Sequence, residues 1–257
     1  MLLGVSSGYS HAATVVVDPL NPNGWAFQVT SADGIGAFVG GPGTPPLGSG
    51  SARLFTGTHG DDSAQIRTPT YNGVSLSSLT QLAYSTHVTS WNGQQAPYII
   101  LNVDLDANGS VDDLLFFEPA YQNPVDGNPA LPNQGTASTG VWQTWDALSG
   151  GWWSLNSIAG ATPGTGVKSL GDYLAVESGA MLSTTALGAV RLVTGFASAP
   201  DVFDGNVDKF VIAVSGSETI YDFEAAAPVP EPTTLLLWGT TAVGLAAVRR
   251  WRNRRAV

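Results

Sequence analysis

A hydrophobic period of two between Thr14 and Glu224 limits the fold of this chain more than any other feature. Residues 82–88 read LAYSTHV and residues 210–214 read FVIAV. Successive side chains of a strand point to opposite faces, so this alternation is typical of half-buried strands. Turn residues separate further segments that we expect to be strands, at Trp25–Thr30, Ala52–Phe55, Ala64–Arg67, Pro97–Val103, Leu114–Glu118, Val141–Trp145 and Ala189–Phe196.

One short helix is expected at Ser169–Ser178, where Ser169 can cap the first turn and Leu170, Tyr173 and Leu174 share a face. Many strands, long loops and a single helix predict an all-β domain over residues 14–224. We expect an antiparallel two-sheet sandwich, jelly-roll-like, followed by a linker at residues 225–228.

The amino-acid composition excludes some kinds of functional site and argues against some kinds of binding partner. The chain has no cysteine, which excludes disulfides, thiolate metal sites and cysteine nucleophiles. Five of the ten basic residues lie in the last nine positions, and Glu231 is the one acid after Val229, so the chain before Val229 carries a net charge of −14. Such a surface repels phosphate backbones and attracts divalent cations, so we expect no nucleic acid partner.

The N-terminal residues 1–13 read MLLGVSSGYSHAA and end in the small-x-small pattern of a signal-peptidase site. They lack the basic residues that begin a signal peptide. We expect them to be the remnant of a signal peptide that starts further upstream, with an ordinary N-terminal arm as the alternative.

The C-terminal segment 229–257 has three parts in order. Pro230, Glu231 and Pro232 precede an apolar run over 233–248, and an arginine-rich cluster follows that begins with Arg249 and Arg250. This order resembles the PEP-CTERM sorting tail of exported bacterial proteins. The resemblance implies recognition by an exosortase, cleavage near the motif and transfer to the cell surface or extracellular matrix.

The apolar run is also long enough to act as a membrane helix. Its residues 233–248 rise about 24 Å as a helix, and flanking tryptophan and arginine side chains can extend that span toward a ~30 Å hydrocarbon core. Arginines after the helix predict a cytoplasmic C-terminus and an external domain, transiently anchored in the inner membrane. A plain anchor that is never processed is the alternative.

The middle of the chain resembles an uncharacterised β-sandwich domain that recurs in exported bacterial proteins. The residues that carry this resemblance are Pro97–Val103 running into Asp104–Gln122, Pro132–Gly135, Trp142–Leu155 and Asp204–Asp208. The resemblance implies no activity.

Residues 104–112 read DLDANGSVD and follow the first nine positions of a calcium-binding loop. The expected ligands are the side chains of Asp104, Asp106 and Asn108, the carbonyl of Ser110, and Asp112. Position 12 is Leu115 where an EF-hand has glutamate, so the loop is not an EF-hand. Asp113 would then have to supply the missing charge.

The alternative is a β-hairpin with Asn108-Gly109 as a type I′ turn. This register would place Asp104 opposite Asp113, and like charges facing each other destabilise a strand pair. A second acidic run, Asp201–Asp208, is a weaker candidate for a calcium loop because its oxygens are irregularly spaced.

Four tryptophans fall within residues 142–153, with Asp146 among them. Indole faces can stack on sugar rings and a carboxylate can bind hydroxyls, although most of these rings are expected to fill the core. Neighbouring Trp152 and Trp153 on one strand must point to opposite faces, so one of them can contact a glycan.

The sequence contains no convincing catalytic set. Asp113 and Glu118 lie five residues apart on one expected strand and therefore point to opposite sides, unlike the paired carboxyls of a glycosidase. His59 and His87 have no metal-ligand spacing and are expected at the surface or at a strand edge.

Three functions remain open: a non-catalytic surface protein with a structural calcium ion and polysaccharide binding, a structural or adhesive surface protein without a small ligand, and a polysaccharide-degrading enzyme. Binding modules and lyases share the same folds, so the fold alone does not decide between them.

Overall fold

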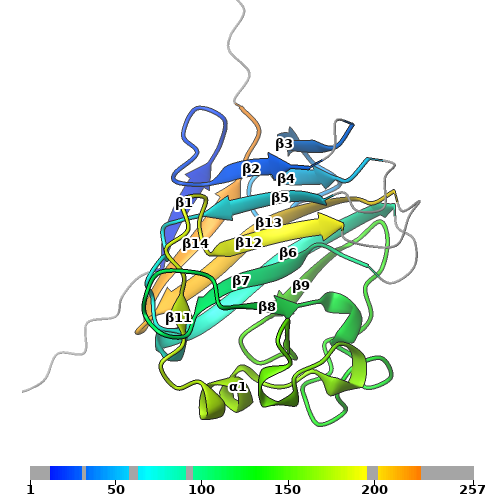
Figure 1. The fold of residues 1–257 in the computed structure, drawn as a ribbon. Coiled ribbons are helices and arrows are strands. Elements are labelled where there is room, and N and C mark those ends of the chain that lie inside the picture. Colours follow the sequence, from blue (N-terminus) through cyan, green and yellow to red (C-terminus); the bar gives the residue numbers. More distant parts are fainter. Residues whose placement is uncertain (1–11, 31–32, 58–62, 91–94, 196–201, 227–257) are drawn as a thin grey trace, which may run out of the picture. The chain divides into compact units, whose positions relative to one another are not determined.

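The computed structural model describes residues 12–30, 33–57, 63–90, 95–195 and 202–226. The chain divides into two compact units, residues 1–225 and 226–257. The described strands lie in the first unit and form two sheets of seven strands each (Figure 1). The predicted all-β sandwich of two sheets with one α-helix is therefore confirmed.

Sheet A has the order β1-β14-β13-β4-β3, with β6 pairing with β13 and β9 pairing with β6. Strand β1 runs parallel to β14, which departs from the expected antiparallel sheet, whereas the other pairs of sheet A are antiparallel. The long strand β13 pairs with three neighbours and so organises the sheet. The bounds are β1 Ala13–Val17, β3 Ile35–Gly40, β4 Gly50–Phe55, β6 Leu79–Ser90, β9 Trp142–Asp146, β13 Asp204–Val214 and β14 Ser217–Phe223.

Sheet B has the order β10-β8-β7-β12-β5-β2, with β11 pairing with β7, and its pairs are antiparallel. The chain crosses between the sheets repeatedly, and the β7–β8 hairpin of sheet B carries the loop at residues 105–112. The bounds are β2 Ala26–Val29, β5 Ser63–Thr68, β7 Tyr98–Asp104, β8 Asp113–Phe117, β10 Trp153–Ser154, β11 Met181–Leu182 and β12 Val190–Gly195.

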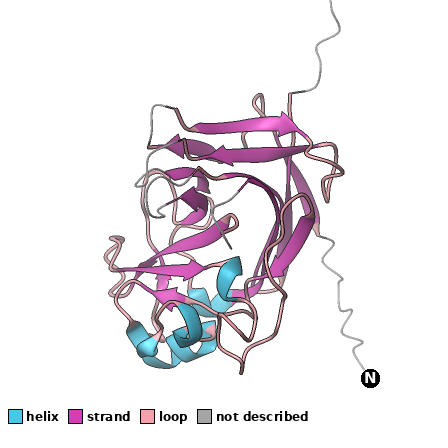
Figure 2. Ribbon diagram, turned by 90° about the vertical axis from the view of Figure 1, so that its right-hand side faces the viewer, coloured by secondary structure: helices cyan, strands magenta, loops and turns pink. Residues whose placement is uncertain are grey.

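The predicted helix is present as α1, Leu170–Val176. Ser169 caps it as expected: its hydroxyl accepts the N–H of Asp172, whose side chain in turn accepts the N–H of Ser169, and this reciprocal pair is a capping box. Short 3₁₀ turns were not expected; they lie at η1 Leu76–Ser78, η2 Pro119–Tyr121, η3 Ile158–Gly160 and η4 Gly164–Gly166. Helical turns gather at one end of the sandwich (Figure 2).

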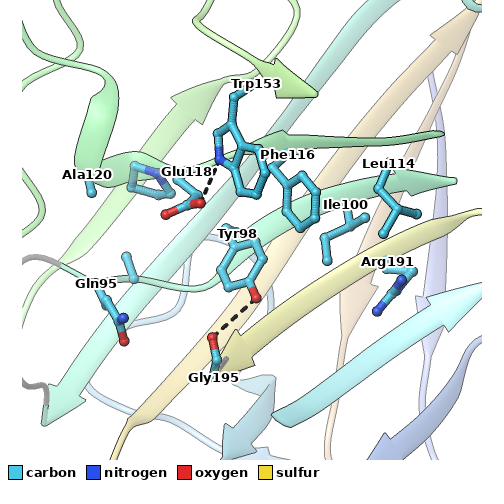
Figure 3. Close-up of a pocket in the computed structure, with 12 residues that line it drawn as sticks. Gln95, Tyr98, Ile100, Leu114, Phe116, Glu118, Ala120, Trp153, Arg191 and Gly195 are labelled. Carbon is cyan, nitrogen blue, oxygen red and sulfur yellow. Dashed lines mark hydrogen bonds between the residues drawn. The ribbon is translucent and has the colours of Figure 1, made fainter. Parts of the chain in front are cut away.

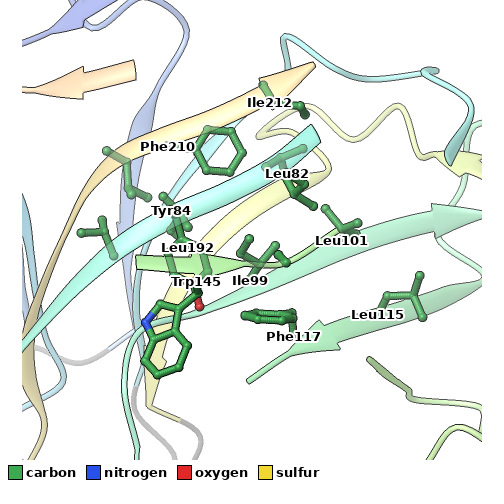
Figure 4. Packing of buried hydrophobic residues seen from close by; sticks show 14 of the residues in the cluster. Leu82, Tyr84, Ile99, Leu101, Leu115, Phe117, Trp145, Leu192, Phe210 and Ile212 are labelled. Atoms are coloured by element: carbon green, nitrogen blue, oxygen red, sulfur yellow. The ribbon is translucent and has the colours of Figure 1, made fainter. Parts of the chain in front are cut away.

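Alternate residues of both sheets fill the space between them (Figure 4). Leu82 and Tyr84 of β6 pack with Ile99 and Leu101 of β7 in one buried cluster. Elsewhere in this core the ring of Trp25 meets the rings of Phe210, Tyr221 and Phe223 edge-on, at centroid distances of 5.3, 5.3 and 5.2 Å. Edge-to-face contacts of this kind add to the stabilisation that burial of the rings provides.

Within the part of the chain that the structure describes, no helix combines the length and apolarity needed to cross a membrane. The expected membrane helix at residues 233–248 lies outside that part, as do residues 1–11 of the expected signal-peptide remnant.

The carboxyl of Asp208 joins strand β13 to two other segments. Asp208 is fully buried, and its two oxygens accept the N–H of Leu47 (3.0 Å) and the N–H of Phe223 (3.1 Å). Burial raises the pKa of Asp208 to about 6, although these backbone donors oppose the shift and nearby Asp222 adds to it. The folded protein therefore holds a proton at pH 5 that the unfolded chain has released.

We expect the free energy of unfolding to fall as pH rises, because the buried carboxyl of Asp208 then loses this proton. The pKa of Asp208 lies near 3.8 in the unfolded chain and about 6 in the fold, so its contribution falls by at most ~1.4 kcal/mol per pH unit between these values. Asp208→Asn removes the titration. Urea unfolding from pH 4 to pH 7 should therefore show the free energy of unfolding of the variant rising relative to wild type across this window. Parallel pH profiles of the two proteins would contradict the buried, shifted carboxyl.

Candidate functional site

The acidic loop connects β7 to β8 and spans residues 105–112. One carboxylate oxygen from each of Asp104, Asp106 and Asp112 lies within 4.8 Å of the other two. Asp104 is buried at the end of β7, whereas Asp106 and Asp112 are exposed. These three predicted ligands are therefore brought together, and the group could hold a metal ion.

Hydrogen bonds from backbone N–H groups to the side chain two residues earlier shape this loop. The N–H of Asp106 donates to Asp104 Oδ1 (3.2 Å), that of Asn108 to Asp106 Oδ1 (3.2 Å) and that of Ser110 to Asn108 Oδ1 (2.7 Å). Gly109 has a left-handed φ of 88° and donates its N–H to Asp104 Oδ2 (2.6 Å). Asp or Asn at every second position thus forms a series of Asx turns that fixes the path of the backbone.

The same donors keep Asp104 ionised. Burial by itself raises the pKa of this carboxyl, but the N–H groups of Gly109, Asn108 and Asp106 outweigh burial and hold the pKa below its usual value. Asp112 is also held in place, because its Oδ2 accepts the N–H of Leu105 at 2.8 Å.

The other predicted ligands behave differently. Asn108 and Ser110 lie in the loop, and the Asn108 amide donates to Asp106 Oδ2 at 2.9 Å. The expected role of Asp113 is wrong. Asp113 is buried on the opposite face of the strand, where its carboxylate accepts Ser154 Oγ (2.6 Å), Tyr173 OH (2.9 Å) and a backbone N–H at residue 156 (3.1 Å). It is a structural anchor for β10 and α1.

The alternative hairpin with a two-residue turn is also wrong. In the observed register Val103 pairs with Asp113 and Asn102 with Leu114, so the connection is an eight-residue loop. Asp113 therefore does not face Asp104, and the like-charge pair that this alternative implied is not formed.

The tryptophan cluster divides as the strand period predicts. Trp145 and Trp152 are buried in the core, with exposed fractions of 0% and 1%, so Trp152 cannot offer a face to a glycan. Trp153 lies on the other side of β10 and is half-buried. Asp146 is not beside Trp153: it lies on sheet A and accepts the hydroxyl of Ser149 at 2.7 Å. The predicted glycan contacts therefore do not form one site: Trp152 is buried, and Asp146 and Trp153 lie on different sheets.

Trp153 belongs to an aromatic cluster on the outer face of sheet B, the face turned away from sheet A. The members of this outer-face cluster are Tyr98, Ile100, Phe116 and Val193, with Leu114 and Trp153 packed against them. The Trp153 and Phe116 rings stack with centroids 3.8 Å apart and an interplanar angle of 3°. The cluster is separate from the main core, so it is not explained by packing between the sheets.

A pocket of about 300 Å³ opens on this cluster (Figure 3). Tyr98, Phe116 and Trp153 supply its aromatic lining, with Glu118 on one side and Arg191 on the other. Trp153 Nε1 donates to Glu118 Oε1 at 2.7 Å, and the Tyr98 hydroxyl donates to the carbonyl of Gly195 at 3.2 Å. These two bonds fix the directions of both rings.

Burial shifts the pKa values of the ionisable groups of the pocket. It raises the pKa of the Glu118 carboxyl, while the Trp153 hydrogen bond opposes that shift. Burial also lowers the pKa of the Arg191 guanidinium to about 10, with a further lowering from nearby Arg67. The pocket thus combines an apolar aromatic wall with a few polar groups, the arrangement typical of small-ligand sites.

Those of the remaining predicted candidates that lie among the described residues do not form a site. Asp204 makes an ion pair with Arg53 (2.8 Å), and Asp208 accepts backbone N–H groups, so these acids of the second run belong to β13 and not to a cation-binding loop; Asp201 lies outside the described residues. His87 is buried on β6, where burial lowers its pKa, so its expected surface or edge position is wrong. His59 lies outside the described residues.

Sequence reasoning missed Tyr98, Phe116, Glu118 and Arg191 as a group. A usable signal was present, because Tyr98, Phe116 and Glu118 lie at alternate positions of the expected strands 97–103 and 114–118, on the face opposite the core. The closeness of Arg191, from a strand distant in sequence, required the pairing of β12 with β7.

Comparison with known proteins identifies the C-terminal segment. Residues 228–250 match the family model described as the PEP-CTERM protein-sorting motif, which confirms the predicted sorting tail containing Pro230, Glu231 and Pro232. The motif marks the chain as an exported, surface-sorted protein that is transiently anchored in the membrane and recognised by an exosortase. Its matched range includes Arg249 and Arg250.

No curated protein matches this chain. One solved structure, described as domains CD (residues 230-489) of another protein, aligns with 72% of this chain at 14% identity and a TM-score of 0.32. The alignment spans 63% of that structure's chain, which is less than two thirds of its length. At this level the likeness carries no argument about fold or function.

Proposed function

We propose that the β-sandwich is a non-catalytic binding module, which holds a polysaccharide of the envelope or matrix in the outer-face pocket and a structural calcium ion in the acidic loop. The observation that carries this proposal is the pocket itself. It places the stacked Trp153 and Phe116 rings beside Glu118 on the face of sheet B that sheet A does not cover.

A sugar fits the chemistry of this pocket. Aromatic faces stack on the C–H faces of pyranose rings, while a carboxylate accepts hydrogen bonds from hydroxyls. Tyr98 and Phe116 have ring centroids 6.5 Å apart, so together with Trp153 they form a continuous aromatic wall. An apolar wall with polar groups at its ends suits a ligand that has both kinds of surface.

Calcium fits the acidic loop because it prefers several oxygen ligands in flexible geometry. Asp104, Asp106 and Asp112 supply three carboxylates, and carbonyls and water can complete the shell. The loop joins β7 and β8, and the same two strands carry Tyr98 and Phe116 of the pocket. An ion that stiffens the hairpin would therefore also stabilise the pocket wall.

A polysaccharide-degrading enzyme is less well supported. A glycosidase needs two carboxyls about 5–9.5 Å apart across the substrate, whereas Glu118 is the one acid among the described residues that line the pocket. A structural or adhesive protein without a small ligand would not account for the aromatic wall of the pocket. Polysaccharide binding by the wild-type chain and by Trp153→Ala distinguishes such a protein from a binding module.

We expect Trp153→Ala to weaken polysaccharide binding without unfolding the domain. Loss of one stacking contact costs ~1–3 kcal/mol, by analogy with stacking on bases. Trp152→Ala is the matched control, because it removes a neighbouring ring from the core and should destabilise the fold by ~3–5 kcal/mol. The measurement is a glycan-array screen of the full-length chain in detergent, with melting curves of each variant. If Trp153→Ala unfolds the domain, or leaves binding intact, the pocket is not the site.

We expect calcium to raise the melting temperature of the wild-type chain. A ligand bound only by the folded state adds ~2.7 kcal/mol at a hundredfold excess over Kd, a shift of a few degrees in a domain of this size. Magnesium should do less because it demands a tighter octahedral shell. Asp106→Ala should abolish the shift.

Asp113→Ala separates ligation from architecture in the same experiment. Removal of this anchor leaves the donors at Ser154 and Tyr173 unpaired, so the variant should melt lower in both calcium and chelator while its calcium-dependent shift remains. Identical wild-type melting curves in calcium and in chelator would exclude the ion.

We expect the surface form of the protein to lack the residues that follow Pro230-Glu231-Pro232, because the exosortase cleaves near this motif. In a host with an exosortase, Glu231→Ala should accumulate as a membrane-bound precursor. Mass spectrometry of the cell-surface fraction tests both expectations. A surface form that retains Arg254 and Arg255 would show a permanent anchor instead.

A further inference from the structure

Two arginines face each other on the outer face of sheet B. Arg67 of β5 and Arg191 of β12 are directly opposite in the antiparallel register. Arg67 is 8% exposed, and Arg191 is half-buried and lines the outer-face pocket. We call these two residues the arginine pair.

The partners of the arginine pair are neutral. Arg191 donates from Nε to Gln65 Oε1 (2.8 Å) and from Nη1 to Asn102 Oδ1 (3.2 Å). Arg67 donates to Gln28 Oε1 (3.1 Å) and to two backbone carbonyls at residues 187 and 188. Among the described residues, no carboxylate forms an ion pair with either guanidinium, and Nη2 of Arg191 has no acceptor.

The position of the arginine pair is unfavourable for the stability of the fold when no ligand is bound. Like charges directly opposite on a strand pair are destabilising, and charges removed from water are normally paired with an opposite charge. Burial lowers the pKa of Arg191, and the proximity of Arg67 lowers it further. The chain before Val229 has five basic residues against nineteen acidic ones, so carboxylates are abundant, yet none of the described ones neutralises this pair.

We propose that the arginine pair binds an anionic group of the ligand, which makes the ligand an acidic polysaccharide carrying carboxylate or sulfate groups. This inference rests on the proposed binding function and specifies its ligand class. Arg191 contacts the anion from the pocket, while Arg67 behind it adds positive potential. The sugar ring that bears the anion lies against the aromatic wall of Tyr98 and Phe116, between Arg191 and Glu118.

The geometry gives each part of such a ligand a partner. A guanidinium donates charge-assisted hydrogen bonds to carboxylate or sulfate oxygens, and Nη2 of Arg191, which has no acceptor among the described residues, is available for this. Burial raises the pKa of Tyr98, the negative charge of Glu118 adds to this shift and the positive charge of Arg191 opposes it, so Tyr98 lies within reach of both charges. The two ends of the pocket therefore differ in sign and would orient the sugar.

The test compares acidic polymers with uncharged counterparts. The full-length chain in detergent is titrated calorimetrically with polygalacturonate, alginate, hyaluronate and dextran sulfate, and also with methyl-esterified polygalacturonate, unsulfated dextran and single-stranded DNA. We expect at least one acidic polysaccharide to bind, its uncharged counterpart to bind at least about tenfold more weakly, and added salt to reduce the difference.

Arg191→Gln should reduce the affinity for the acidic polymer about 10- to 100-fold, the loss of a charge-assisted hydrogen bond. Arg53→Gln is the matched control: it changes the net charge equally, but its guanidinium lies on sheet A and is already paired with Asp204. It should bind like wild type.

Several results would overturn the inference. Equal binding of charged and uncharged polymers, equal losses in the two arginine variants, or Arg191-dependent binding of DNA alone would each do so. If an uncharged polysaccharide binds through Trp153 and Arg191→Gln has no effect, only this inference fails. If no polysaccharide of either kind binds, the proposed function fails with it.

Discussion

The packing of the inner face of sheet B against sheet A determines what the outer face presents. Ile99, Leu101 and Phe117 are fully buried between the sheets, and burial of each such side chain contributes about 1.5–3 kcal/mol. Because the side-chain period of a strand is two, fixing these residues inward forces Tyr98, Ile100 and Phe116 outward. The pocket is therefore a consequence of core packing. A register shift of one residue in β7 or β8 would exchange the two faces of the strand and so disrupt both the core and the pocket.

The β7–β8 hairpin connects the two candidate sites. At its turn, Asp104 at the end of β7 lies close to Asp106 and Asp112 of the acidic loop, and along its outer face Phe116 supports Trp153. On its inner face Asp113 receives three hydrogen bonds from β10, the following turn and α1. One hairpin thus carries the candidate ion site at its turn, the pocket wall on its outer face and the anchor for β10 and α1 on its inner face. Asp112 and Asp113 are adjacent, but Asp112 belongs to the candidate ion site and Asp113 to the anchor.

Sequence reasoning recovered the parts of the structure that local patterns determine. Nine segments with strand character became strands, and Ser169 capped the helix, because alternation and capping act within a few residues. Strands β10 and β11 have two residues each, too few to show a period. The role of Asp113 depended on the strand register. Its position next to the calcium-like motif suggested a ligand, but the pairing of β8 with β7 places its side chain in the core. The meeting of Arg67 with Arg191 depended on pairing between segments more than a hundred residues apart, which a single sequence does not reveal.

The position of β14 has a mechanical consequence for a protein that is delivered to a surface through its C-terminus. Strand β14 lies between β1 and β13, with five paired residues on each side, and it is the last strand before residue 226. A pull on the chain that is directed along β14 acts parallel to the strand, while its ladder hydrogen bonds run across the strand. Tension therefore loads both ladders in shear, so that many bonds share the force at once instead of opening one after another. The strand nearest the sorting tail is in this way clamped on both edges against being drawn out of the sandwich.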